Sequence, residues 1–173
     1  MIKSFPPDQA EESEQPQKKQ DAPAKPVKKP SLRKQRRYAR ERATQALYQQ
    51  MLNPTAVDLL EAQFMEDPFM LRVDLSLFRA IIRGVSQNAA MLDQEIEPFL
   101  DRALSELDPI EHAILRLGAY ELAFNPETPR AIVINESVEL AKRFGASEAH
   151  RYINGVLDQL ADHLRPDEPR QRG

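Results

Sequence analysis

The sequence contains no cysteine and no tryptophan, and it has only five glycines in 173 residues. The lack of cysteine excludes disulfides, thiolate metal sites and cysteine nucleophiles, and it suits the reducing cytoplasm. So few glycines, without tryptophan, are unusual for a turn-rich β-protein. There is no apolar run of the length that spans a bilayer, and the first residues lack the apolar segment of a signal peptide. We therefore expect a cytoplasmic protein with no membrane contact.

The formal net charge of −3 hides an uneven distribution of charge. Residues 1–42 carry twelve basic and six acidic side chains, a balance of +6. Residues 43–173 carry twelve basic and twenty-one acidic side chains, a balance of −9. An acidic body with a basic N-terminal part indicates an anionic partner that meets one end of the molecule.

Residues 1–32 are expected to form a disordered tail. Six of the fourteen prolines lie in the first thirty residues, and large apolar side chains are scarce there. Burial therefore cannot offset the conformational entropy lost on ordering, roughly 1–2 kcal/mol per residue. A folded part is predicted over residues 33–166, followed by a flexible end at 167–173. Its length suits one domain or two small subdomains that share a core.

Apolar residues recur at helical spacing through the predicted folded part. Capping side chains and prolines divide this pattern into seven helices. They cover about residues 31–52, 56–65, 74–85, 92–100, 108–124, 131–144 and 148–164. The clearest start is Asp108-Pro109, a capping carboxylate followed by proline at the first helical position. The sequence therefore predicts an all-α fold, a seven-helix bundle without strands.

Four residues in or next to the later helices are given structural roles. Asn135 and Asn154 interrupt apolar runs, and we expect each to make a hydrogen bond that fixes helix packing. Gly155 is expected to permit a close contact between helices, since glycine inside a helix otherwise costs up to ~1 kcal/mol. Gly145 is expected to end its helix in the left-handed conformation.

The strongest local signal is the segment 33–42, in which six of ten residues are basic. On a helix Arg36 and Arg40 share one face, and Arg37 lies close to it. These arginines are expected to face solvent at a helix start, where the helix dipole does not favour cations. Guanidinium groups suit phosphate oxygens, and Tyr38 could stack on a base. Nucleic-acid binding is therefore favoured over a solvated charge run that only aids solubility.

No catalytic or metal-binding pattern accompanies this basic segment. The three histidines lack ligand spacing, no Gly-x-Ser-x-Gly motif occurs, and the glycines form no phosphate loop. We therefore expect a protein that is not an enzyme and that uses no cofactor and no metal.

Three segments of the chain resemble the NusB family of transcription antitermination proteins. They are RRYARERATQALYQ at 36–49, INESVELAKRFG at 134–145 and HRYINGVLD at 150–158. The resemblance covers about residues 33–165 and implies a helical fold of two small subdomains. It also implies that the protein binds boxA-type single-stranded RNA together with NusE, a small-subunit ribosomal protein. Both would act in the antitermination complex of RNA polymerase on ribosomal RNA operons.

The resemblance further assigns roles to individual residues. It implies RNA contacts for Arg36, Arg37, Arg40 and Tyr152, with the carboxylate of Glu148 beside the RNA path.

The same resemblance implies a NusE-facing surface at Glu111, with Phe99 as a neighbour. The chain departs from the family at Tyr38, where some relatives carry a further arginine.

Several alternatives stay open at this point. The chain could be a free-standing RNA-binding module related to the N-terminal part of RNA cytosine methyltransferases, a helical DNA-binding regulator, or a protein–protein adaptor. A homodimer is as compatible with the sequence as a monomer.

Overall fold

The computed structural model describes residues 28–170, which form six α-helices and three short 3₁₀ helices without any strand. The elements in chain order are α1 (Leu32–Leu52), α2 (Val57–Met65), η1 (Pro68–Arg72), α3 (Leu75–Ile96), η2 (Glu97–Phe99), η3 (Leu104–Glu106), α4 (Pro109–Phe124), α5 (Arg130–Phe144) and α6 (Ala149–Leu164). The predicted all-α class is confirmed. Residues 1–27 of the predicted tail lie outside the described residues. Among the helices described, none is both long and apolar enough to cross a membrane.

Capping side chains set the starts of three helices. The hydroxyl of Ser31 accepts a hydrogen bond of 3.4 Å from the amide of Lys34 at the start of α1. The carboxylate of Asp74 accepts one of 3.1 Å at the start of α3. Asp108 accepts one of 2.9 Å at the start of α4, with Pro109 following. These oxygens satisfy amides that would otherwise lack a partner in the first turn.

The predicted third and fourth helices are one helix, α3, so the expected count of seven is wrong by one. The only non-helical residue inside α3 is Asn88, with φ −117° and ψ 16°. Its side-chain amide donates a 2.7 Å hydrogen bond to the carbonyl oxygen of Gly84. In a regular helix the Gly84 carbonyl would accept from the backbone amide of Asn88, and here the side chain of Asn88 takes that place. The helix therefore bends at Asn88 and continues to Ile96.

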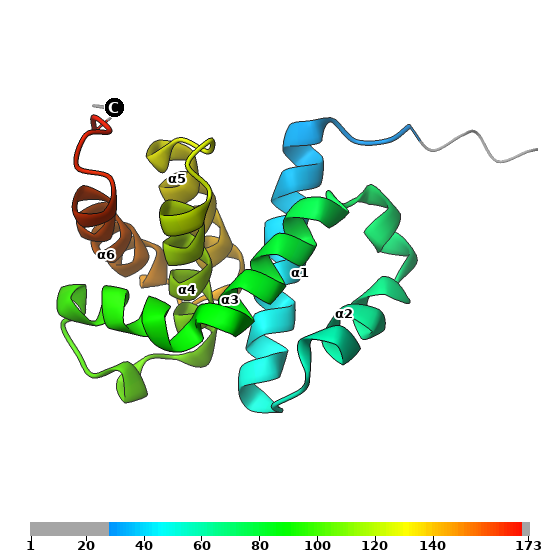
Figure 1. Cartoon of the computed structure of the whole chain (residues 1–173), viewed down its shortest axis with the longest axis horizontal. Helices are drawn as coiled ribbons and strands as arrows, with labels where there is room; N and C mark the ends of the chain where they lie inside the picture. Colours follow the sequence, from blue (N-terminus) through cyan, green and yellow to red (C-terminus); the bar gives the residue numbers. More distant parts are fainter. Residues whose placement is uncertain (1–27, 171–173) are drawn as a thin grey trace, which may run out of the picture.

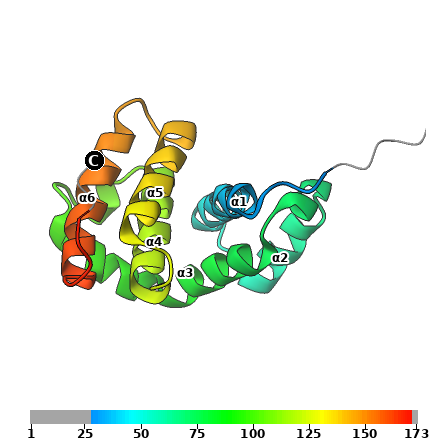
Figure 2. The same cartoon turned by 90° about the horizontal axis from the view of Figure 1, so that it is seen from above.

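Helix α3 lies across the molecule and joins two halves (Figure 1). The segment of α1, α2 and η1 forms one half, and α4, α5 and α6 form the other. Seen from above, α1 lies between α2 and the α4–α6 half (Figure 2). The buried residues Ala39, Ala43 and Ala46 line α1, and their small side chains let this helix approach its neighbours closely. One apolar core runs through both halves.

The end of the chain is tied to the α4–α5 connection by two arginines. The guanidinium of Arg165 donates to four backbone carbonyls at the end of α4 and in the following loop: Glu121, Leu122, Asn125 and Thr128. Carbonyls at a helix end lack intrahelical partners, so a buried cation suits them. Arg130 forms ion pairs with Asp158 and Asp162, and its amide donates to Glu168. Residues 167–170 were expected to belong to a flexible end, but one of them, Glu168, is hydrogen-bonded to the start of α5.

The structure overturns the roles expected for four residues near α5 and α6. Asn135 and Asn154 are exposed, because they lie on the outer faces of their helices and not in the core. A Cβ atom added to Gly155 would meet no atom within 4 Å, so no close helix contact needs it. Gly145 is extended, with φ −89°, and not left-handed. A Cβ atom there would lie 2.8 Å from the carbonyl oxygen of Ala141, so its role is close packing.

Candidate nucleic-acid interface

The basic face of the molecule is the opening of α1. The helix starts directly after an extended segment, Lys28 to Ser31. The backbone amide of Asp74 donates a 3.1 Å hydrogen bond to the carbonyl oxygen of Gln35, which holds the start of α3 against this opening. Arg33 is exposed, and the side chains of Arg36 and Arg37 are 54% and 43% exposed. The expectation that arginines face solvent at this helix start is correct for these three residues.

Arg36 and Arg37 are held by long ion pairs. Arg36 Nε lies 3.6 Å from Asp74 Oδ2, and Arg37 Nη2 lies 3.4 Å from Glu136 Oε1. Hydrogen bonding to Glu136 and its negative charge raise the pKa of Arg37. Partly exposed ion pairs of this kind contribute at most about 1 kcal/mol. The two carboxylates therefore orient the guanidinium groups but bind them weakly enough for an anion to compete.

Arg40 differs from the other arginines because it is buried. Its side chain is only 5% exposed and donates two 2.8 Å hydrogen bonds to the carboxylate of Glu121, which is completely buried. Burial by itself lowers the pKa of Arg40, but the hydrogen bonds and charge of Glu121 outweigh it and the pKa is raised. The expected solvent-facing orientation is wrong for Arg40, because a buried carboxylate on α4 takes up its guanidinium. No local pattern around Arg40 indicated this partner, which is 81 residues away.

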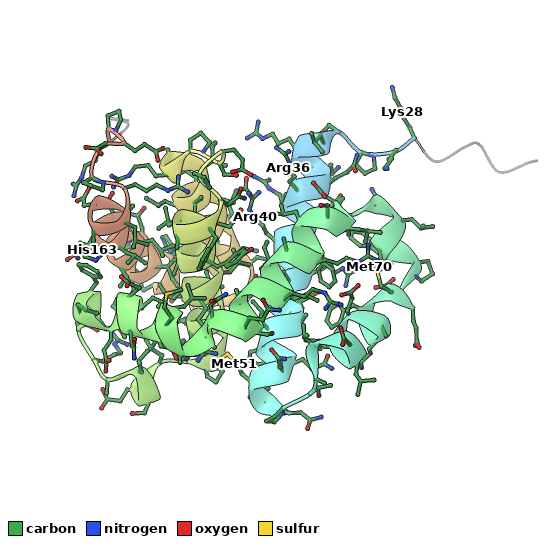
Figure 3. The ribbon with its side chains drawn as sticks, viewed as in Figure 1. Lys28, Arg36, Arg40, Met51, Met70 and His163 are labelled. Atoms are coloured by element: carbon green, nitrogen blue, oxygen red, sulfur yellow. The ribbon has the colours of Figure 1, made fainter. Side chains whose placement is uncertain are left out.

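A cavity of about 550 Å³ lies between the opening of α1 and the first half of α5. We call it the α1–α5 cavity, and Arg33, Arg36, Arg37, Asn135 and Glu136 are among the residues that line it. Figure 3 shows Arg36 and Arg40 on the side of α1 that faces α5. The exposed amide of Asn135 was missed as a site residue, because its apolar neighbours in the sequence suggested a packed position. The cavity offers guanidinium groups and one neutral amide, which can donate to phosphate or to a base.

Tyr38, where some relatives carry arginine, belongs to an aromatic cluster on the other flank of α1. Its ring packs edge-on against Phe69 of η1, with 4.9 Å between ring centroids. The guanidinium of Arg72 lies 5.4 Å from the Tyr38 centroid, and that of Arg42 lies 4.3 Å from the Phe69 centroid. Tyr38 therefore joins α1 to η1 and is not among the residues that line the α1–α5 cavity.

Tyr152 and Glu148 lie at the far end of α5 from the arginines. Arg37 pairs with Glu136 in the first half of α5, whereas Glu148 and Tyr152 follow the end of that helix. Glu148 is exposed and pairs with Arg151 at 3.3 Å. The structure thus brings Arg36 and Arg37 together and places the α6 residues in a second area.

The Tyr152 ring is covered by a cation. The guanidinium of Arg102 lies 4.5 Å from the ring centroid, and burial raises the pKa of the Tyr152 hydroxyl. Burial and the negative charge of Asp108 raise the pKa of the Glu111 carboxyl. The positive charge of Arg102 also acts on Glu111 and lowers the pKa by less, so the pKa is raised. Arg102 therefore links the Tyr152 area to the start of α4. Nothing in the sequence around Arg102 indicated this position.

The two residues expected to face a protein partner lie on different elements, Glu111 on α4 and Phe99 on η2. Glu111 is half-buried in the first turn of α4. Phe99, at the end of η2, lies 6.1 Å from the ring of His163, centroid to centroid. A groove of about 780 Å³ starts beside Glu111, where Ile110 lines it together with the exposed Tyr48 and Leu52 of α1.

Among residues 28–170, no three histidine or acidic side chains are grouped so that they could hold a metal ion. Within that range the interface offers guanidinium groups, carboxylates, amides and aromatic rings.

Comparison with known proteins identifies one family. The sequence pattern of the NusB family matches residues 37–162. The transcription antitermination protein NusB of Marinobacter nauticus is 50% identical over 137 residues, which cover 79% of this chain and 87% of that protein. The NusB protein of Marinomonas sp. is 48% identical over 149 residues, 85% of this chain and 86% of its own length.

Solved structures agree with the fold. T. maritima NusB has 31% sequence identity and a TM-score of 0.64, and the match covers 73% of this chain and 89% of that one. A crystal structure of the antitermination factors NusB and NusE in complex with double-stranded RNA matches with a TM-score of 0.62 and covers 73% of this chain and 96% of that one. Its sequence identity is 23%, so this match supports the fold alone.

Proposed function

The chain belongs to the NusB family, and on that premise we propose that it is a cytoplasmic transcription antitermination factor that binds boxA-type single-stranded RNA together with NusE. In this role it joins the antitermination complex of RNA polymerase on ribosomal RNA operons. The mechanism is non-catalytic, because binding alone recruits and orients the partners. Residues 33–166 form the RNA-binding domain.

One observation carries the RNA-binding part of this proposal: Arg36 and Arg37 are half-exposed and held by ion pairs of 3.4–3.6 Å beside the α1–α5 cavity. Guanidinium groups bind phosphate oxygens in a fork geometry, and at 3.4–3.6 Å their present contacts with Asp74 and Glu136 are longer than strong charge-assisted hydrogen bonds. Arg33, which is exposed next to them, adds a third cation. Phosphate binding positions the RNA, while contacts to unstacked bases read its sequence.

Arg40 supports these contacts from behind. Two of its N–H groups bind Glu121 and its side chain is only 5% exposed, so it fixes α1 on α4 and presents little surface to RNA. We therefore assign phosphate binding to Arg33, Arg36 and Arg37, and a positioning role to Arg40.

Tyr152 and Glu148 form the second contact of the RNA. Helix α5 has 15 residues, so the two areas are about 20 Å apart at a rise of ~1.5 Å per residue. A single strand that starts at the arginines and follows α5 reaches Tyr152, where a base can stack on the ring beside Arg102.

NusE binds at Glu111 and Phe99, and the groove that Ile110, Tyr48 and Leu52 line starts at the residue next to Glu111. A half-buried carboxylate next to exposed apolar side chains is suited to a partner with a basic residue at the rim of an apolar patch.

The RNA part of the proposal is tested by salt dependence. If Arg33, Arg36 and Arg37 each neutralise one phosphate, the slope of log K against log salt for boxA RNA is about −2. The double variant Arg36→Ala/Arg37→Ala should bind more weakly, with a slope of about −0.7. The matched control is Arg79→Ala/Arg83→Ala on α3, whose side chains are 46% and 40% exposed and share a carboxylate partner.

Each rival function predicts another result. A slope that is equal in the wild type and the Arg36→Ala/Arg37→Ala variant would contradict phosphate binding at this site. Equal or tighter binding of the DNA copy of boxA would favour a DNA-binding regulator. NusE binding without any RNA binding would leave a protein–protein adaptor.

A further inference from the structure

Two aromatic rings form an exposed platform at the end of α4. The rings of Tyr120 and Phe124 are stacked, with 5.3 Å between centroids and an interplanar angle of 30°. Phe124 is 48% exposed, so its ring is accessible on the side that Tyr120 does not cover. Gly84 of α3 makes room for the platform, because a Cβ atom there would overlap the ring of Tyr120. The platform is thus built into the packing of α3 on α4.

This platform forms one side of a second cavity of about 340 Å³, which we call the aromatic cavity. Arg36, Asp74, Tyr120, Phe124 and Glu127 are among the residues that line it. Its volume lies at the lower end of the range for pockets that hold small ligands or single ligand groups.

The charges of the aromatic cavity are balanced, which favours a neutral group over a phosphate. Two arginines, Arg36 and Arg40, and two carboxylates, Asp74 and Glu127, line it, whereas four arginines and three carboxylates line the α1–α5 cavity and leave it with one excess positive charge. Carboxylates only accept hydrogen bonds, and they therefore suit N–H groups on the edge of a base. An aromatic ring binds the face of any base by stacking.

The aromatic cavity is continuous with the proposed phosphate site. Arg36, Arg40, Glu127 and Thr128 line both this cavity and the α1–α5 cavity. A strand whose phosphates lie on Arg36 and Arg37 can therefore direct one base into the aromatic cavity while its backbone stays at the arginines.

We propose that the aromatic cavity is a nucleobase pocket, in which one unstacked base of the bound single-stranded RNA stacks on Phe124 and donates an N–H group to Asp74 or Glu127. This inference rests on the proposed RNA binding and adds a base-recognising site to it. Phe124 is the binding residue, Tyr120 supports its ring, and Gly84 positions Tyr120.

The test combines protein and RNA changes in titrations of boxA RNA with the full chain. Phe124→Ala and Phe124→Leu should each weaken binding about 5- to 150-fold, the range expected for the loss of one base–aromatic stack. Phe124→Tyr keeps a ring and should bind like the wild type. The salt slope should not change in any of the three, because the arginines remain. Leu71→Ala, which removes an apolar side chain that is 79% exposed on η1, is the matched control.

A set of boxA RNAs, each with one nucleotide replaced by an abasic ribose, then locates the base. With the wild type, one abasic RNA should bind as weakly as unmodified boxA RNA binds to Phe124→Ala. With Phe124→Ala, that abasic RNA and unmodified boxA RNA should have equal affinities. Thermal unfolding of each variant shows that the fold is retained.

The outcomes separate this inference from the proposed function. If the wild type binds RNA and responds to Arg36→Ala/Arg37→Ala, but Phe124→Ala binds equally well and no abasic position couples to it, the nucleobase pocket is overturned and RNA binding stands. If Phe124→Ala weakens NusE association and leaves RNA binding alone intact, the platform is a protein contact and the pocket is again overturned. If the wild type binds no RNA, both proposals fall.

Discussion

The carboxylate of Glu121 on α4 accepts two 2.8 Å hydrogen bonds from the guanidinium of Arg40 on α1, and neither side chain is more than 5% exposed. Arg36 lies on α1 one helical turn before Arg40, and both arginines line the same two cavities. Because the hydrogen bonds are paired and parallel, they fix the rotation of α1 as well as its distance from α4. The direction in which the exposed arginines project therefore depends on a buried contact between two halves of the fold.

The loss of one partner of this pair should destabilise the protein strongly. Arg40→Met keeps the length of the side chain but leaves the Glu121 carboxylate buried without a counter-ion, and the expected loss is about 3–5 kcal/mol in the free energy of unfolding. Urea denaturation measures it. Adding Glu121→Leu to Arg40→Met removes the unpaired charge and should recover most of the loss. A double variant no more stable than Arg40→Met would show that burial of the charge is not the cause.

If Arg37 binds phosphate as proposed, the carboxylate of Glu136 competes with RNA for its guanidinium. Its removal in Glu136→Gln frees the guanidinium and removes a negative charge from the α1–α5 cavity. We expect boxA RNA to bind about 2- to 5-fold more tightly at low salt, a gain that matches the small worth of an exposed ion pair, and the gain should shrink at high salt. Fluorescence anisotropy titrations check this.

Glu139→Gln is the matched control, since it removes the same charge one turn later on α5 from a carboxylate that pairs with Lys142. An equal gain in both variants would mean that net charge, and not the release of Arg37, sets the affinity.

The sequence predicted features that depend on local chemistry. The start of α4 could be read from Asp108-Pro109, because a capping carboxylate and a proline act within one turn. The exposed arginines at the opening of α1 could be predicted in the same way, since the basic run and the helix start are both local features of the sequence.

The features that the sequence did not predict depend on contacts between distant segments. Spacing on α1 could not distinguish Arg40 from Arg36, because the difference is made by Glu121, 81 residues later. The kink of α3 is confined to Asn88, whose side chain donates to the carbonyl oxygen of Gly84, so the helix continues beyond it. The base platform needs Gly84, Tyr120 and Phe124 from two helices, and no local pattern joins them.

Reversal of the charge of Glu111 should weaken the association with NusE. Glu111→Lys places a cation in a half-buried position near Arg102, where like charges repel. We expect at least a tenfold loss of affinity in a titration with purified NusE, and no change in helical content by circular dichroism. Glu66→Lys, an exposed charge reversal at the end of α2, is the control and should bind normally. Equal affinities of the two variants would remove Glu111 from the NusE surface.

Acid stability should depend on Asp93, which ties α3 to α4. Its carboxylate contacts the ring of His112 at 2.7 Å and the guanidinium of Arg116 at 2.6–2.8 Å. Burial raises the pKa of Asp93, but Arg116 and His112 outweigh it and lower the pKa from 3.8 to about 2. Because the folded pKa lies below the unfolded one, this carboxylate contributes stability above pH 3.8 that is lost as the pH falls to about 2.

The expected contribution is at most roughly 2 kcal/mol, because each unit of pKa shift corresponds to about 1.4 kcal/mol and solvent near the pair reduces its worth. Asp93→Asn should be less stable than the wild type at pH 6, and the difference should shrink steadily between pH 5 and pH 2, since only the wild type has this carboxylate to protonate. Urea denaturation across that range measures both curves. Asp58→Asn, which neutralises a carboxylate that is 79% exposed, should give a curve nearly parallel to the wild type. If Asp93→Asn also runs parallel to the wild type down to pH 2, the ion pairs of Asp93 do not hold α3 on α4, and the acid sensitivity of the fold has another source.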